Sequence, residues 1–123
     1  MALILVVDND AAVRHFLQFV LERAGHEVLE ATNGKDAVEM CRKQVDLIIT
    51  SLFMPVQDGY ETIEKLKKEY PGLRIIAMSD GFRDFQQTVL IGMAIKLGAK
   101  AGMQKPLTVE VVLATVEKVL ASK

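Results

Sequence analysis

The strongest constraint on the fold of this chain is a regular alternation of short apolar runs with stretches of helical periodicity. The apolar runs predict strands at residues 3–7, 26–31, 47–51, 74–78 and 100–103. Each run is followed by a helical pattern, at about residues 11–24, 34–43, 60–70, 84–97 and 108–121. Runs that are apolar throughout are typical of strands buried on both faces of a parallel sheet. The alternation therefore predicts an α/β fold built from right-handed βαβ units.

Length, charge and cysteine content narrow the class of protein. A chain of 123 residues predicts one domain, spanning residues 1–123. Fifteen basic and sixteen acidic residues give a formal net charge of −1, which argues against a nucleic-acid-binding module with a basic surface. The single cysteine, Cys41, excludes an intramolecular disulfide, and we expect a small thiol that is packed or half exposed. No apolar run approaches the roughly 20 residues of a membrane span, so we expect a cytoplasmic protein without membrane contact.

Polar residues gather where the predicted strands end. The carboxyl ends of parallel strands lie at one edge of the sheet, and ligands of α/β proteins bind beyond that edge. The residues at these ends are Asp8, Asn9, Asp10, Ser51, Ser79 and Lys105. The sequence therefore predicts a polar functional site there.

Four segments, taken together and in order, resemble the receiver domain of two-component response regulators. They are LILVVDND, DLIITSLFMPVQDGYE, RIIAMSD and LGAKAGMQKPL, and the resemblance covers essentially the whole chain. It implies a flavodoxin-like three-layer sandwich, with five helices around a five-stranded parallel sheet of order 2-1-3-4-5. It also implies a signalling protein rather than an enzyme. The implied partners are a histidine kinase, an effector or another signalling protein of a phosphorelay.

The resemblance assigns roles at the strand ends. In a typical receiver, two acids after the first strand and an aspartate ending the third hold Mg²⁺, and that aspartate accepts the phosphoryl group. A hydroxyl residue and a lysine contact the phosphoryl group. Asp8 and Lys105 match this pattern, and Ser79 keeps the hydroxyl. Asn9 replaces the second acid, and Ser51 stands at the acceptor position.

These replacements predict a degenerate phosphorylation pocket. Two lost carboxylates weaken Mg²⁺ binding and leave Asp8 as the matching metal ligand, so we expect no cofactor, or at most weakly bound Mg²⁺. The simplest arrangement is then a direct or water-mediated ion pair between Asp8 and Lys105, although the lysine is also suited to binding an anion. Gly102 stands where the family usually has the aromatic residue that reports phosphorylation. We therefore predict a pseudo-receiver, a protein interaction module that works without phosphorylation.

Two alternatives remain open at this point. One is a phosphorelay receiver that is phosphorylated atypically, on Ser51 or through Asp10. A serine hydroxyl needs a neighbouring base to become a good nucleophile, and we expect Asp10 to cap the helix that follows it instead of replacing the lost acid. The other is a flavin-binding electron carrier of the same topology, in which Asp8 and Asp10 would repel the cofactor phosphate.

The helix predicted at 84–97 lacks a polar residue from Val89 to Ile95. A surface helix normally has an apolar stripe on one face only, so part of this run should point away from the sheet unless a long bent helix buries it all. Val111 is left over in the same way on the last helix. In the receiver family, the fourth helix, fifth strand and fifth helix form the usual dimer and effector surface. We therefore expect an interface with a partner protein or with a second copy of the chain that includes Leu90, Ile91, Met93, Ile95 and Val111.

Overall fold

The computed structural model describes residues 1–54, 56–79 and 87–122 and contains one parallel sheet. Its strands are β1 (Leu3–Val7), β2 (Glu27–Ala31), β3 (Leu47–Ser51), β4 (Arg74–Ser79) and β5 (Ala101–Gln104). Their order is β2-β1-β3-β4-β5, with all neighbours parallel, which confirms the predicted flavodoxin-like topology. The predicted strand ends differ from the observed ones by one residue at positions 26, 79, 100 and 104.

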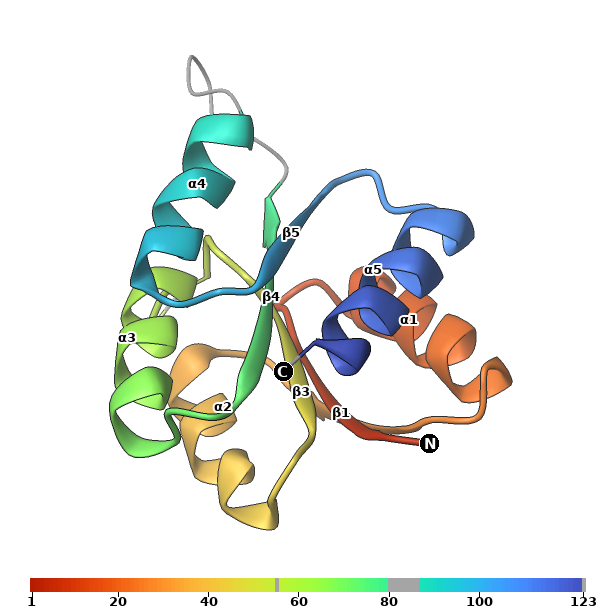
Figure 1. The fold of residues 1–123 in the computed structure, drawn as a ribbon, viewed down its shortest axis with the longest axis horizontal. Coiled ribbons are helices and arrows are strands. Elements are labelled where there is room, and N and C mark those ends of the chain that lie inside the picture. Colours follow the sequence, from red (N-terminus) through yellow and green to blue (C-terminus); the bar gives the residue numbers. More distant parts are fainter. Residues whose placement is uncertain (55, 80–86, 123) are drawn as a thin grey trace.

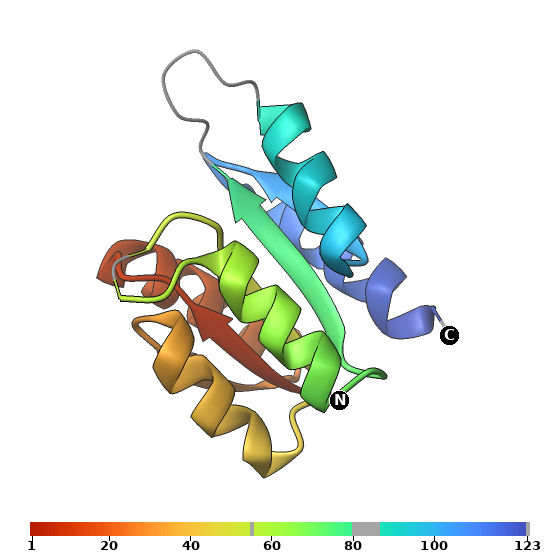
Figure 2. The ribbon, with the colours of Figure 1, turned by 90° about the vertical axis from the view of Figure 1, so that its left-hand side faces the viewer.

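Helices cover both faces of the sheet (Figure 1). They are α1 (Ala11–Arg23), α2 (Gly34–Met40), the 3-10 turn η1 (Cys41–Lys43), α3 (Gly59–Glu69), α4 (Gln87–Leu97) and α5 (Val109–Ala121). One face carries α1 and α5, and the other carries α2, α3 and α4, which stand in front of the sheet in Figure 2. The predicted start of the fourth helix at residue 84 lies outside the described residues. Among the helices of the described segments, none is long and apolar enough to cross a membrane.

Local signals fix where these helices begin and end. The side chain of Asp10 accepts the backbone N–H of Ala12 at 2.9 Å, so it caps α1. Side-chain caps of the same kind precede α2, α3 and α5, at Asn33, Asp58 and Thr108. Gly25 follows α1 with a φ of 95°, a backbone conformation that favours glycine after a helix end.

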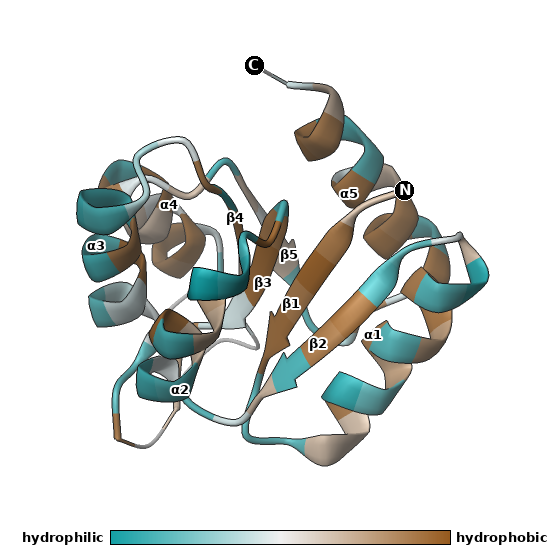
Figure 3. Cartoon of the chain, turned by 90° about the horizontal axis from the view of Figure 1, so that it is seen from below, coloured by the Kyte–Doolittle hydropathy of each residue, from teal (hydrophilic) through white to brown (hydrophobic). Residues whose placement is uncertain are grey.

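The strands divide the hydrophobic core into two clusters. Leu5 and Val7 of β1 face the cluster under α2, α3 and α4, whereas Ile4 and Val6 face the cluster under α1 and α5. All four side chains are fully buried. Figure 3 shows the apolar strands between more polar helices. This two-sided burial explains why β1 is apolar at every position.

The burial of Leu90 on α4 contradicts one sequence prediction, that this residue belongs to an exposed interface. Leu90 is 5% exposed and packs into the core, so it is not an interface residue in this position of the helix. Leu90 and Ala94 lie one turn apart and both face inward, because residues four apart share one side of a helix. Helices α4 and α5 both expose large hydrophobic residues. They are Val89 (52%), Met93 (51%) and Ile95 (47%) on α4, and Val109 (43%) and Val111 (45%) on α5. Ile91 is partly buried.

Candidate functional site at the carboxyl ends of the strands

The strand register brings the predicted polar residues to one edge of the sheet. Val7 of β1 pairs with Thr50 of β3, so Asp8 and Ser51, each the next residue along, end neighbouring strands. Ser79 ends β4, and its carbonyl accepts the backbone N–H of Lys105 at 2.8 Å. Asp8, Ser51 and Ser79 are all buried. We call these three side chains, together with that of Lys105, the polar pocket.

An ion pair between Asp8 and Lys105 occupies the centre of this polar pocket. The lysine Nζ lies 2.8 Å from Asp8 Oδ2, and the two side chains are 15% and 2% exposed, respectively. The predicted ion pair is therefore confirmed in its direct form. Asp8 Oδ1 accepts the backbone N–H of Asp10 at 2.9 Å. Both carboxylate oxygens thus have a hydrogen-bond donor within the protein, one of them a charged donor.

Arg14 fixes the turn between β1 and α1, a role that the sequence analysis missed. Its guanidinium donates to the backbone carbonyl of Asp8 at 2.8 Å. The same group forms an ion pair with Glu30 at 3.1 Å. The only sequence signal was a basic residue in the first turns of the helix that follows a strand-end aspartate. Arg14 therefore holds the backbone on which Asp8 stands.

Ser51 lies at the end of a fully buried strand and is 5% exposed. Its hydroxyl donates to the carbonyl of Phe53 at 3.5 Å, the outer limit of a hydrogen bond. Within the described ranges, no imidazole or carboxylate hydrogen-bonds to this hydroxyl. The Ser51 hydroxyl therefore has no base beside it to raise its nucleophilicity.

The start of α3 packs directly against the end of β3. The backbone N–H of Gly59 donates to the carbonyl of Leu52 at 2.9 Å. A Cβ at position 59 would lie 2.7 Å from the Cα of Leu52, and nearer still to the carbonyl oxygen of Ser51. Only glycine fits there, so this contact fixes where the loop after β3 ends.

The donor set fits Mg²⁺ poorly. Mg²⁺ requires several oxygen ligands in near-octahedral geometry, including carboxylates that neutralise its charge. Asp8 already accepts from Lys105 and from a backbone amide, Asn9 is exposed, and Asp10 caps α1. In residues 1–54, 56–79 and 87–122, no group of three or more His, Cys, Asp or Glu side chains could hold a metal ion.

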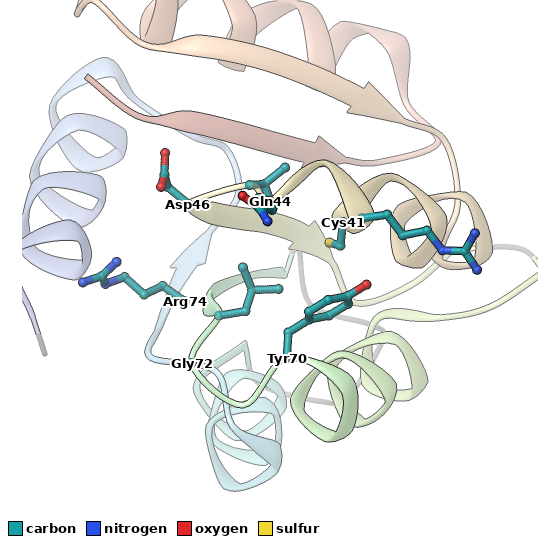
Figure 4. A pocket seen from close by; sticks show the side chains of 9 residues that line it. Cys41, Gln44, Asp46, Tyr70, Gly72 and Arg74 are labelled. Carbon is teal, nitrogen blue, oxygen red and sulfur yellow. The ribbon is translucent and has the colours of Figure 1, made fainter.

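A second pocket, of about 510 Å³, lies at the opposite edge of the sheet, where the strands begin (Figure 4). Its polar groups serve the fold: Asp46 accepts the backbone N–H of Leu3 at 2.8 Å, and Arg74 donates to the carbonyl of Ser122 at 3.0 Å. Burial, and to a lesser extent Glu69, raises the pKa of the Cys41 thiol to about 11. A thiol with this pKa is protonated at neutral pH and inert as a nucleophile. The sequence allowed a packed or a half-exposed thiol at Cys41, and the structure shows the packed one, which is 3% exposed.

Comparisons with known proteins agree with the observed fold. The family model described as the response regulator receiver domain matches residues 4–117. The chemotaxis protein CheY of Thermotoga maritima is 34% identical over 118 residues, which cover 94% of this chain and 95% of that protein. Protein PilH of Pseudomonas aeruginosa is 31% identical over 122 residues, which cover 98% of this chain and 99% of PilH.

A longer relative and a solved structure extend this comparison. The DNA-binding transcriptional regulator NtrC of Azospirillum brasilense is 37% identical over 123 residues, which cover 98% of this chain but only 24% of that protein. The chain thus spans about a quarter of NtrC and nearly all of CheY and PilH. The structure of the chemotaxis response regulator CheY4 of Vibrio cholerae is similar with a TM-score of 0.87 and 27% identity, covering 97% of this chain and 98% of that one.

Proposed function

The chain belongs to the response regulator receiver family, and we propose that it is a pseudo-receiver, an interaction module that works without an aspartyl phosphate. The observation that carries the proposal is the direct ion pair between Asp8 and Lys105 at the end of the sheet, beside a serine that ends β3. The lysine charge is neutralised within the protein, so no phosphoryl group is needed to balance it.

The chemistry at Ser51 also supports this proposal. A receiver with an aspartate at this position uses an ionised carboxylate as the nucleophile, whereas a serine hydroxyl is un-ionised at neutral pH. Ser51 has only the distant carbonyl of Phe53 as a hydrogen-bond partner in the described segments. The exposed Asn9 adds no carboxylate for Mg²⁺. The polar pocket therefore lacks both an activated nucleophile and the metal ligands for phosphoryl transfer.

We place the protein contact of this module on the face formed by α4, β5 and α5. Met93, Ile95 and Val111 are each about half exposed there. A second copy of the chain or a signalling protein with an apolar surface would bury these side chains. The formal net charge of −1 favours a protein partner over a nucleic acid.

The second candidate is a receiver that is phosphorylated atypically, on Ser51 or through Asp10. Its support is the intact scaffold: Lys105 and Ser79 stand at the same sheet edge as Ser51. Against it, the Asp10 carboxylate already accepts the backbone N–H of Ala12 as the cap of α1. Moving this carboxylate into the polar pocket would cost the cap, about 1 kcal/mol.

Intact-mass measurement after incubation with acetyl phosphate, with and without Mg²⁺, separates the two candidates. We expect no added phosphoryl group on the parent chain. The Asn9→Asp, Ser51→Asp variant should gain one phosphoryl group in Mg²⁺, because it restores both missing carboxylates. A matched control, Asp8→Asn in the same variant, should lose that gain. A Mg²⁺-dependent gain on the parent would overturn the pseudo-receiver, and peptide mapping would then locate the phosphate.

A further inference from the structure

We propose that α4 is locked in one position because Ile91 occupies the side-chain space of Gly102 in β5, so the outer face of α4 is presented permanently. The proposal deepens the proposed function and rests on it, since it explains how an interaction surface can be set without phosphorylation. It concerns the contact between α4 and β5, which is separate from the polar pocket.

The space beside Gly102 is filled from the neighbouring helix. A Cβ built on Gly102 would lie 3.0 Å from both Cβ and Cδ1 of Ile91, and nearer still to its Cγ2. Isoleucine is branched at Cβ and has one strongly preferred χ1 rotamer in a helix, so it cannot simply swing aside. The side chain of Ile91 therefore fits against β5 only because residue 102 has none.

Two hydrogen bonds hold α4 at other points. The hydroxyl of Tyr60 on α3 donates to the carbonyl of Leu90 at 2.9 Å. The side-chain amide of Gln87, in the first turn of α4, donates to the carbonyl of Lys105 after β5 at 3.2 Å. Neither bond uses a side chain of the polar pocket. Together with Ile91, they fix α4 to α3, to β5 and to the segment after β5.

The lock determines which side chains α4 exposes. With Ile91 turned to β5 and Leu90 and Ala94 turned to the core, Val89, Met93 and Ile95 are left about half exposed. Rotating the helix to bury them would remove Ile91 from the space at Gly102. The apolar outer face of α4 is therefore a fixed consequence of the packing at Gly102.

Two glycine-to-alanine variants test the lock. Gly102→Ala adds a methyl group where Ile91 already lies, whereas Gly92→Ala, the matched control on α4, adds one where no heavy atom lies within 4 Å. Backbone amide exchange of residues 88–97 is measured in each. We expect exchange roughly tenfold faster in Gly102→Ala, and equal or slower in Gly92→Ala because alanine favours helix.

Removing the isoleucine gives the complementary test. Ile91→Ala alone should also speed exchange of α4, and this variant adds no atoms, so it serves if Gly102→Ala does not fold. The double variant Ile91→Ala, Gly102→Ala should exchange more slowly than Gly102→Ala, because the second methyl group then enters vacated space. Unchanged exchange in Gly102→Ala, or no recovery in the double variant, would overturn the lock.

A last measurement separates this proposal from the proposed function. The phosphorylatable Asn9→Asp, Ser51→Asp variant is compared before and after acetyl phosphate treatment. A locked α4 predicts exchange rates in residues 88–97 that agree within about twofold between the two states. A larger change would refute the lock even if the parent chain is never phosphorylated. Phosphorylation of the parent would instead refute the pseudo-receiver and leave the glycine tests valid.

Discussion

The polar pocket and the outer face of α4 reverse the usual distribution of side chains in a globular protein. In the pocket, the charged Asp8 and the polar Ser79 are each 1% exposed. On α4, the apolar Val89 and Met93 are each about half exposed. Buried charge is tolerated where it is paired, as Asp8 is with Lys105. In the described part of the chain, both oxygens of the Asp8 carboxylate thus have hydrogen-bond donors, whereas the large apolar side chains on the outer face of α4 are about half exposed.

The neighbouring helix α3 does not share this exposure of apolar side chains. Both helices lie on the same side of the sheet (Figure 2). The outer face of α3 carries exposed charged residues, which are Glu61, Glu64, Lys65, Lys68 and Glu69. Figure 3 shows the resulting contrast in hydropathy between the two helices. A helix with only solvent outside it normally has the pattern of α3, and the departure of α4 from that pattern supports the proposed protein contact.

The largest change in stability is expected when the lysine of the ion pair is removed. We expect Lys105→Met to lower the free energy of unfolding by roughly 3 kcal/mol, because it leaves Asp8 buried and unpaired. The additional change Asp8→Asn should recover most of that loss, since no buried charge then remains. Urea denaturation of the three proteins measures both effects. A loss below 1 kcal/mol would mean that the pair behaves as a surface salt bridge and that the pocket is not closed.

The next largest change in stability is expected on the buried side of α4, at Leu90. Leu90→Ala should lower the free energy of unfolding by about 2.5 kcal/mol, because it opens a cavity in the core. Leu90 is 5% exposed and belongs to the cluster under α2, α3 and α4. Thermal or urea unfolding measures the change. A near-neutral change in the free energy of unfolding would mean that Leu90 lies on the exposed face of α4 and not in the core.

A smaller effect concerns the hydrogen bond from Tyr60 to the carbonyl of Leu90. Tyr60→Phe should cost about 1 kcal/mol and loosen α4. Burial, and then the nearby Asp58, raises the pKa of Tyr60 above its ordinary 10.0. The folded state therefore holds the phenolic proton more tightly than the unfolded state does. This contribution to stability is complete below pH 10.0 and is lost as the pH rises toward the raised pKa.

Urea midpoints of the parent and of Tyr60→Phe, measured from pH 8 to pH 11, check this prediction. The two proteins should converge at the alkaline end, because the parent loses its bonded proton there. Parallel curves would mean that Tyr60 does not titrate in the folded protein as its raised pKa requires.

The smallest change in stability is expected on the outer face of α4. Met93→Lys should alter the free energy of unfolding by less than about 0.5 kcal/mol, since the side chain is half exposed. The same substitution should abolish any self-association, because a charge would enter the apolar contact. Sedimentation velocity of the parent and the variant compares their oligomeric states. Dimers that survive Met93→Lys would place the contact elsewhere.

The sequence alone predicts the sheet and the polar edge well. Every position of β1 is apolar and β3 begins with three apolar residues, and the polar residues at the ends of such runs mark the strand ends. The resemblance to the receiver family then allowed Asp8 and Lys105 to be paired from the sequence. The orientation of α4 could not be predicted in the same way. When Val89, Leu90 and Ile91 are all apolar, periodicity does not say which of them faces the sheet.

Contacts between elements that are distant in the sequence determine the positions of side chains that the local sequence does not predict. Ile91 is partly buried because Gly102, eleven positions later on another element, leaves room for it. Arg14 reaches both Asp8 and Glu30 because α1 passes beside β2. Neither contact has a signature in the residues adjacent to it in the sequence. Such contacts depend on the assembled sheet, whose strand order comes from the topology and not from local propensity.

The ion pair also affects how the chain folds. Asp8 and Lys105 are separated by 97 positions, and β1 and β5 are not neighbours, because β3 and β4 lie between them. The pair forms only after every intervening crossover has been closed, which makes it one of the highest contact-order interactions in the molecule. The ion pair stabilises only the chain whose sheet is complete, and it contributes no stability to a chain that has folded only its first half. The ion pair of the polar pocket thereby increases the cooperativity of folding.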